Sequence, residues 1–129
     1  MTRDFRVWID EVEALGLLKT VEGADWDGEI GAITDANSKR NKYTLLFDKI
    51  KGYPEGYRVI TNPLASVRKV ALTFGMPTNL SNLDFVKKWR EMAGSFKPIP
   101  PVVVKDGPVL ENVQQGKDVN VLKFPTPKW

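Results

Sequence analysis

The chain has 129 residues, 42% hydrophobic and 27% charged, a balance typical of a folded domain and not of a disordered chain. Its 19 basic and 16 acidic residues leave a formal net charge of only +3, which argues against a nucleic-acid-binding surface. It contains no cysteine and no histidine, which excludes disulfides, thiolate metal sites and a histidine general base.

The amino terminus is charged and amphipathic. Asp4, or Thr2 with a slightly earlier start, can cap a first helix that Gly16 ends. The apolar residues that recur at helical spacing in this helix are Phe5, Trp8, Ile9, Val12 and Leu15. No apolar run resembles a secretory signal or a membrane span, so we expect a cytoplasmic protein.

The next elements predict a small sheet. Residues 17–21 favour a short strand, and residues 27–39 favour a second helix. Strands are expected at 43–50 and 57–61, and the turn-forming segment 51–56 joins them as a hairpin.

Two more helices follow the break at Asn62-Pro63. Ser66 is expected to cap a short helix that Gly75 ends, and Ser81 or Asn82 begins a longer one that runs to about Ala93. The order of elements predicts an α+β (α/β) fold with a small mixed sheet and about four helices.

Residues 97–129 differ from the rest of the chain. Short β-prone runs at 101–104, 109–113 and 119–122 alternate with proline, glycine and Asp-Gly turn signals. We expect an N-terminal α/β domain over residues 1–96, a hinge at 96–101, and then extended strands of an all-β unit.

The chain ends on an extended segment that carries Trp129. An exposed tryptophan and unpaired strand edges need a partner surface. We therefore expect an N-terminal piece of a longer protein, in which residues 100–129 are frayed or paired with a neighbouring chain.

Two charged clusters are candidate sites. The acidic residues Glu22, Asp25, Asp27 and Glu29 resemble a hard-cation loop in charge, but they lack its spacing, and acids also gather in the first turn of a helix. The basic stretch 38–42 could contact phosphate, although a solvated helix end explains it as well.

Other candidates have ordinary structural explanations. Lys87, Lys88 and Arg90 fall on the solvent face of the last helix, and Asp35 with Lys39 forms an i, i+4 pair. The aromatic residues that could stack on rings, but whose spacing favours a core, are Phe5, Trp8, Trp26, Phe74, Phe85 and Trp89.

Six phrases together carry a resemblance to a known family. They are DFRVWIDEVEALGLLKTV, WDGEIGAITDANSKR, TLLFDKIKGYPEGYRVITN, SVRKVALTFGM, KPIPPVVVKDGPVLENV and GKDVNVLKFPTPKW. In this order they resemble the amino-terminal region of the UbiD family of reversible decarboxylases. The most specific parts are Lys51–Pro54, Pro101–Val109 and Phe124–Trp129.

The resemblance implies a multi-domain enzyme that acts on aromatic, heteroaromatic or α,β-unsaturated carboxylic acids. Its N-terminal α/β domain would precede a split β-barrel that binds prenylated FMN, a divalent metal (Mn or Mg) and a monovalent cation (K); a C-terminal domain would mediate oligomerisation. The cofactor supplies the difficult chemistry in such enzymes. The family's metal ligands and its Glu-Arg-Glu set match no position here, so we expect no catalytic, cofactor-binding or metal-binding residue in this chain.

Two functions remain open. The chain is either the inactive N-terminal segment of such a decarboxylase, packed against the rest of the enzyme or neighbouring subunits, or a stand-alone assembly subunit. In the second case residues 98–129 dock on a partner by strand addition. No nucleic-acid or membrane partner is expected.

Overall fold

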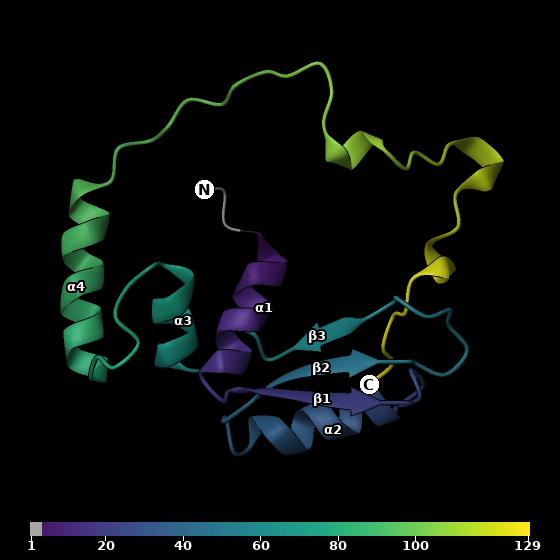
Figure 1. The fold of residues 1–129 in the computed structure, drawn as a ribbon, viewed down its shortest axis with the longest axis horizontal. Helices are drawn as coiled ribbons and strands as arrows, with labels where there is room; N and C mark the ends of the chain where they lie inside the picture. Colours follow the sequence, from purple (N-terminus) through teal and green to yellow (C-terminus); the bar gives the residue numbers. More distant parts are fainter. Residues whose placement is uncertain (1–3) are drawn as a thin grey trace.

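The computed structural model describes residues 4–129, in which a small sheet lies between helices (Figure 1). The α-helices and strands are α1 (Phe5–Ala14), β1 (Leu18–Glu22), α2 (Glu29–Ser38), β2 (Thr44–Asp48), β3 (Val59–Thr61), α3 (Val67–Thr73) and α4 (Asn82–Ser95). The α+β class, the small mixed sheet and the four α-helices of the described chain agree with the prediction from the sequence.

The sheet has the strand order β1-β2-β3. β1 and β2 run parallel, and α2 makes the crossover connection that parallel neighbours require. β2 and β3 run antiparallel, with Leu45 opposite Thr61 and Phe47 opposite Val59, which confirms the predicted hairpin.

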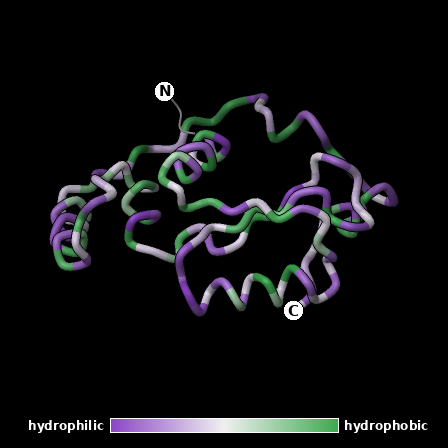
Figure 2. The backbone as a smooth tube through the Cα atoms, turned by 60° about the horizontal axis from the view of Figure 1, so that its bottom comes forward, coloured by the Kyte–Doolittle hydropathy of each residue, from purple (hydrophilic) through white to green (hydrophobic). Residues whose placement is uncertain are grey.

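The two faces of the sheet bury two separate cores. Phe47 and Leu45 of β2 pack with Ile30 of α2 in one of them. Trp8 and Val12 of α1 pack with residues around β1 and α3 in the other. This division follows from the alternation of side chains along a strand, because neighbouring residues point to opposite faces. The views agree that α2 and α1 lie on opposite sides of the sheet (Figures 1 and 2).

Side-chain caps form at two of the predicted helix starts. The Asp4 carboxylate accepts a hydrogen bond from the Arg6 amide at 3.1 Å, and the Ser81 hydroxyl accepts one from the Asp84 amide at 3.1 Å. The alternative cap, Thr2, lies outside the described residues. Ser66 is the first residue before α3, as predicted, but its hydroxyl makes no capping bond and is buried without a partner.

α4 lies at the edge of the molecule. It buries none of its residues, and its contact with the domain runs through α3, where the rings of Phe74 and Trp89 meet edge to face at 4.5 Å. The helix is therefore a peripheral element with an exposed apolar side.

The three β-prone runs beyond α4 do not form strands. The chain is extended there and is interrupted by 3-10 turns at Pro108–Leu110, Gly116–Asp118 and Val121–Lys123. The strand prediction for 101–104, 109–113 and 119–122 is therefore wrong in this structure. The physical reason is that a strand needs a neighbour for its backbone groups, and these segments lie beside no strand among residues 4–129.

No helix in the described part of the chain is both long enough and apolar enough to cross a bilayer.

Candidate functional site

The acidic residues Glu22, Asp25, Asp27 and Glu29 make local hydrogen bonds and ion pairs. The Glu29 carboxylate accepts a hydrogen bond from the Asp25 amide at 2.8 Å, and Asp25 in turn accepts one from the Asp27 amide at 2.9 Å, so both acids organise the start of α2. Glu22 pairs with Lys49 at 2.9 Å, and this carboxylate raises the pKa of the lysine. The helix-start interpretation is therefore correct for Asp25, Asp27 and Glu29, whereas it is wrong for Glu22, which ends β1.

These acids do not converge on a common point. Within residues 4–129, no group of three or more carboxylate, imidazole or thiol side chains is arranged to hold a metal ion.

The basic stretch 38–42 lies at the end of α2. Lys39 forms the predicted ion pair with Asp35 at 2.8 Å, which raises the pKa of Lys39. Arg40 and Lys42 instead line an open pocket of about 450 Å³ with Tyr43, next to this helix end. Lys87, Lys88 and Arg90 are exposed on α4, as predicted.

The aromatic residues are less buried than their spacing predicts. Trp8 is in the core with 5% of its surface exposed, and Trp26 packs against the other core. Phe5, Phe74 and Trp89, however, are exposed. The core interpretation is wrong for these three because the helices that carry them are covered on one side only.

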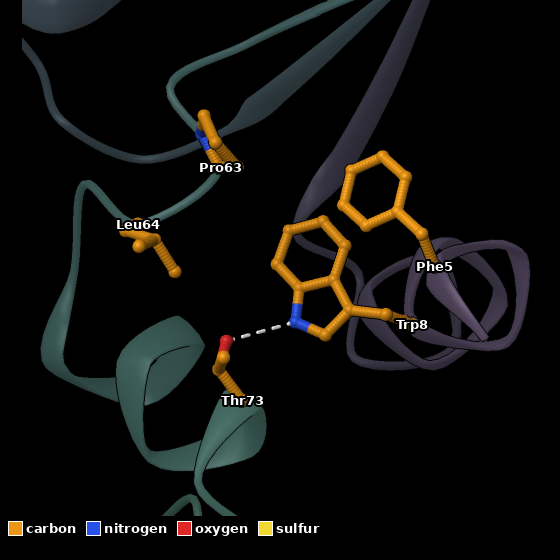
Figure 3. A pocket seen from close by; sticks show the side chains of 5 residues that line it. All are labelled: Phe5, Trp8, Pro63, Leu64 and Thr73. Carbon is orange, nitrogen blue, oxygen red and sulfur yellow. Dashed lines mark hydrogen bonds between the residues drawn. The ribbon is translucent and has the colours of Figure 1, made fainter. Parts of the chain in front are cut away.

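Phe5 and Trp8 form one wall of an apolar pocket between α1 and α3 (Figure 3). Their rings stack at a centroid distance of 5.4 Å, and the Trp8 indole N–H donates to the Thr73 hydroxyl at 3.0 Å. Pro63 and Leu64 line the opposite side, and the volume is about 410 Å³. The lining offers hydrophobic surface and a single hydroxyl, so the pocket suits an apolar side chain better than a charged substrate.

Lys69 is fully buried beside this region, a feature that the helical spacing does not predict. Its ammonium donates a hydrogen bond of 2.9 Å to the carbonyl of Asn62, and burial lowers its pKa. The Thr44 hydroxyl donates to the same carbonyl at 3.3 Å. This shared acceptor fixes Asn62, whose backbone is left-handed with φ of 55°, at the end of β3.

Residues 98–129 form a C-terminal arm that loops from α4 to the far end of the sheet (Figures 1 and 2). Contacts of Phe124 and Lys128 hold its end. The Phe124 ring meets Tyr57 edge to face at 6.0 Å, and Lys128 forms a parallel bridge with Asp27. The Lys128 amide donates to the Trp26 carbonyl at 2.9 Å, and its ammonium lies 3.2 Å from Asp27.

The expectation that the arm is frayed or held by another chain is therefore wrong for its last residues, which the chain holds itself. Trp129 nevertheless stays 79% exposed, in agreement with the prediction that nothing in the chain buries it. The exposed apolar residues between the hinge and this end are Ile99, Val102, Val103, Val104, Val109, Leu110, Val113, Val119, Val121, Leu122 and Phe124. So many in one segment are unusual on the surface of a monomeric protein.

Comparison with known proteins decides the family. Residues 9–89, more than half of the chain, match the model of the 3-octaprenyl-4-hydroxybenzoate carboxy-lyase N-terminal domain. The chain belongs to the UbiD family. The resemblance stated from the six phrases is thus confirmed.

Two curated relatives are decarboxylases. The chain is 35% identical over 133 residues to pyrrole-2-carboxylic acid decarboxylase of Pseudomonas aeruginosa, covering 96% of the chain and 26% of the relative. It is 33% identical over 127 residues to phenolic acid decarboxylase of Sedimentibacter hydroxybenzoicus, covering 95% of the chain and 26% of that protein. The UbiD chain thus spans about a quarter of the length of these relatives.

Solved structures confirm the fold. The vanillic acid decarboxylase of Sedimentibacter hydroxybenzoicus in closed form superposes with a TM-score of 0.81 at 32% identity, over 95% of this chain and 26% of that one. The open form of the same enzyme superposes with a TM-score of 0.77 at 30% identity, over 97% of this chain and 28% of that one. The UbiD chain is therefore similar to one region of a larger decarboxylase over nearly its whole length, arm included.

Proposed function

We propose that the chain is the N-terminal segment of a decarboxylase that acts on aromatic or α,β-unsaturated carboxylic acids through prenylated FMN. The observation that carries the proposal is the match of 95% or more of the chain to about a quarter of proteins named as decarboxylases of aromatic acids. In this proposal the protein is cytoplasmic and homo-oligomeric, and the segment itself supplies no catalytic residue.

The residues present do not fit the family's cofactor and its metal. The sequence has no histidine. The carboxylates of Glu22, Asp27 and Glu29 lie beside Lys49, Lys128 and Lys51, at 2.9, 3.2 and 3.9 Å respectively. A magnesium or manganese site needs several oxygen ligands directed at one point, which these acids do not provide. We therefore assign the prenylated FMN and metal sites to polypeptide outside this chain and derive no catalytic step here.

The role left to this segment is to pack against the cofactor-binding polypeptide. The exposed apolar residues of the C-terminal arm support this role, because such surface is stabilised when another surface covers it. Ligand sites often lie where two domains meet. The segment would thus contribute one wall beside the cleft without touching the reacting atoms.

The exposed arm also favours a second candidate, an assembly subunit that docks on a separate partner through residues 98–129. The reading frame separates the two candidates. An open frame that continues after the codon for Trp129 supports the enzyme segment, whereas a stop codon there supports the subunit.

The test of the enzyme proposal uses the purified 129-residue chain with prenylated FMN, Mn²⁺ and K⁺ under anaerobic conditions. We expect an unchanged flavin absorption spectrum and no CO₂ release from pyrrole-2-carboxylate or vanillate. Tight flavin binding with CO₂ release by this chain alone would contradict the assignment of the chemistry to other polypeptide.

A further inference from the structure

Two lysines from different parts of the chain lie over one aromatic ring at the end of the sheet, and an arginine lines the pocket beside it. The Lys19 ammonium, from β1, lies 5.3 Å from the centre of the Tyr43 ring, and the Lys42 ammonium lies 4.9 Å from it. Arg40, from the turn after α2, lines the same pocket of about 450 Å³ as Lys42 and Tyr43. We refer to Lys19, Arg40, Lys42 and Tyr43 as the Tyr43 surface.

The positive charge of this surface is not neutralised. Among the described residues, none of its three cations forms an ion pair, while the nearby acid Asp35 is held by Lys39 at 2.8 Å. The pKa of the Tyr43 phenol is lowered, first by the neighbouring Lys42 ammonium and further by the charge of Lys19. Clustered, unpaired cations raise the local concentration of anions.

Hydrogen bonds hold the backbone around Tyr43. The Asn37 amide donates to the Tyr43 carbonyl at 2.8 Å, and the Thr44 amide donates to the Leu17 carbonyl at 2.8 Å. Asn41 takes a left-handed conformation with φ of 46°, which turns the chain from α2 toward β2. The backbone that carries the ring is thus held in place before any ligand arrives, which lowers the entropic cost of binding.

We propose that the Tyr43 surface binds an acidic, extended segment of a partner protein. Carboxylates complement the lysine and arginine charges. Within residues 4–129, β1 pairs with β2 alone, so an extended segment has a free strand edge beside Lys19. A nucleic acid fits less well, because it needs a longer row of cations and several stacked aromatic rings. This inference does not depend on the decarboxylase proposal.

The experiment measures binding of a fluorescently labelled octaglutamate peptide to the full chain by anisotropy, at low and at high salt. We expect K19E/K42E to weaken binding by about tenfold or more, since each close charge pair contributes substantially to the complex. The matched control is K87E/K88E, which makes the same change of net charge on exposed lysines of α4. We expect the control to bind within about twofold of the unchanged chain.

Three results would overturn the proposal: no binding of the peptide, equal weakening in the two double variants, or tighter binding of a single-stranded oligouridylate of equal charge. If K19E/K42E fails to fold, the NMR resonances of the Tyr43 ring in the unchanged chain test the proposal instead. They are assigned by comparison with Y43F, and they shift on addition of octaglutamate if the proposal holds and stay unchanged if it does not.

Discussion

Gly31 lies directly beneath Trp129. A β-carbon at residue 31 would come within 3.0 Å of the Lys128 carbonyl oxygen, 3.2 Å of the Trp129 Cα and 3.3 Å of its Cε3. Ordinary carbon contacts are no closer than about 3.5 Å. The absence of a side chain on this turn of α2 thus lets the end of the C-terminal arm lie against the helix.

The first prediction concerns this contact. In G31A we expect the end of the arm to move away from α2, because the added methyl group meets backbone atoms of Lys128 and Trp129 and disturbs the hydrogen bonds that Lys128 makes with Trp26 and Gly28. Hydrogen exchange at the Lys128 amide, which is bonded to Trp26, should speed up. Global stability should stay level or rise by about 0.5–1 kcal/mol, since alanine favours a helix over glycine.

The control is G94A in α4, where an added β-carbon meets nothing within 4 Å. It makes the same change in helix propensity and should leave exchange at Lys128 unaltered. Unchanged exchange in G31A as well would show that the arm does not depend on close approach to Gly31.

The second prediction concerns the hydrogen bond between Trp8 and Thr73. T73V keeps the shape of the side chain but leaves the buried indole N–H without its acceptor at 3.0 Å. We expect the free energy of unfolding to fall by about 1–2 kcal/mol. T73S retains a hydroxyl and should recover most of the loss in urea denaturation. Equal losses in both variants would assign the effect to packing and not to the hydrogen bond.

The third prediction concerns the pH dependence that Lys69 causes. Because burial lowers its pKa in the folded state, the unfolded chain binds one more proton between that pKa and 10.5. The free energy of unfolding should therefore rise as pH increases through this interval. K69M removes the buried charge. We expect its free energy of unfolding to be about 1 kcal/mol higher than that of the unchanged chain near neutral pH, and we expect this difference to disappear as the pH approaches 10.

K87M, at an exposed lysine of α4, is the control and should show no such pH dependence. If the free energy of unfolding depends on pH in the same way in K69M and in the unchanged chain, Lys69 is not desolvated.

The fourth prediction concerns the attachment of α4. W89A removes the ring that meets Phe74 at 4.5 Å and stacks on Phe85 at 6.5 Å. We expect faster hydrogen exchange throughout α4 with little change in β1 and β2, because α4 has no buried residue and rests on the domain through this ring. L83A changes an exposed leucine of the same helix and should leave exchange as it was. Uniform loss of protection in W89A would show that α4 unfolds only with the whole domain.

Local patterns predict the helices and the hairpin well. Asp4 and Ser81 carry caps where the sequence places them, because a cap depends on residues only two or three positions away. The same rule predicts the start of α3 at Ser66 correctly. It does not predict that the Ser66 hydroxyl makes no capping hydrogen bond and is buried without a partner.

Features that depend on distant residues are not predictable in this way. The three β-prone runs of the C-terminal arm have strand-like composition, yet the described chain offers them no strand to pair with. Conversely, no local signal joins Lys128 to Asp27 across 101 positions. The burial of Lys69 and the pocket at Trp8 likewise arise from tertiary packing.

The most direct test of the central claim is native mass spectrometry of the polypeptide that contains this sequence, isolated without denaturation from its own cells. The account predicts that residues 1–129 are joined to, or bound to, polypeptide that carries prenylated FMN. Finding the 129-residue chain alone, with no flavin-bearing partner, would contradict it.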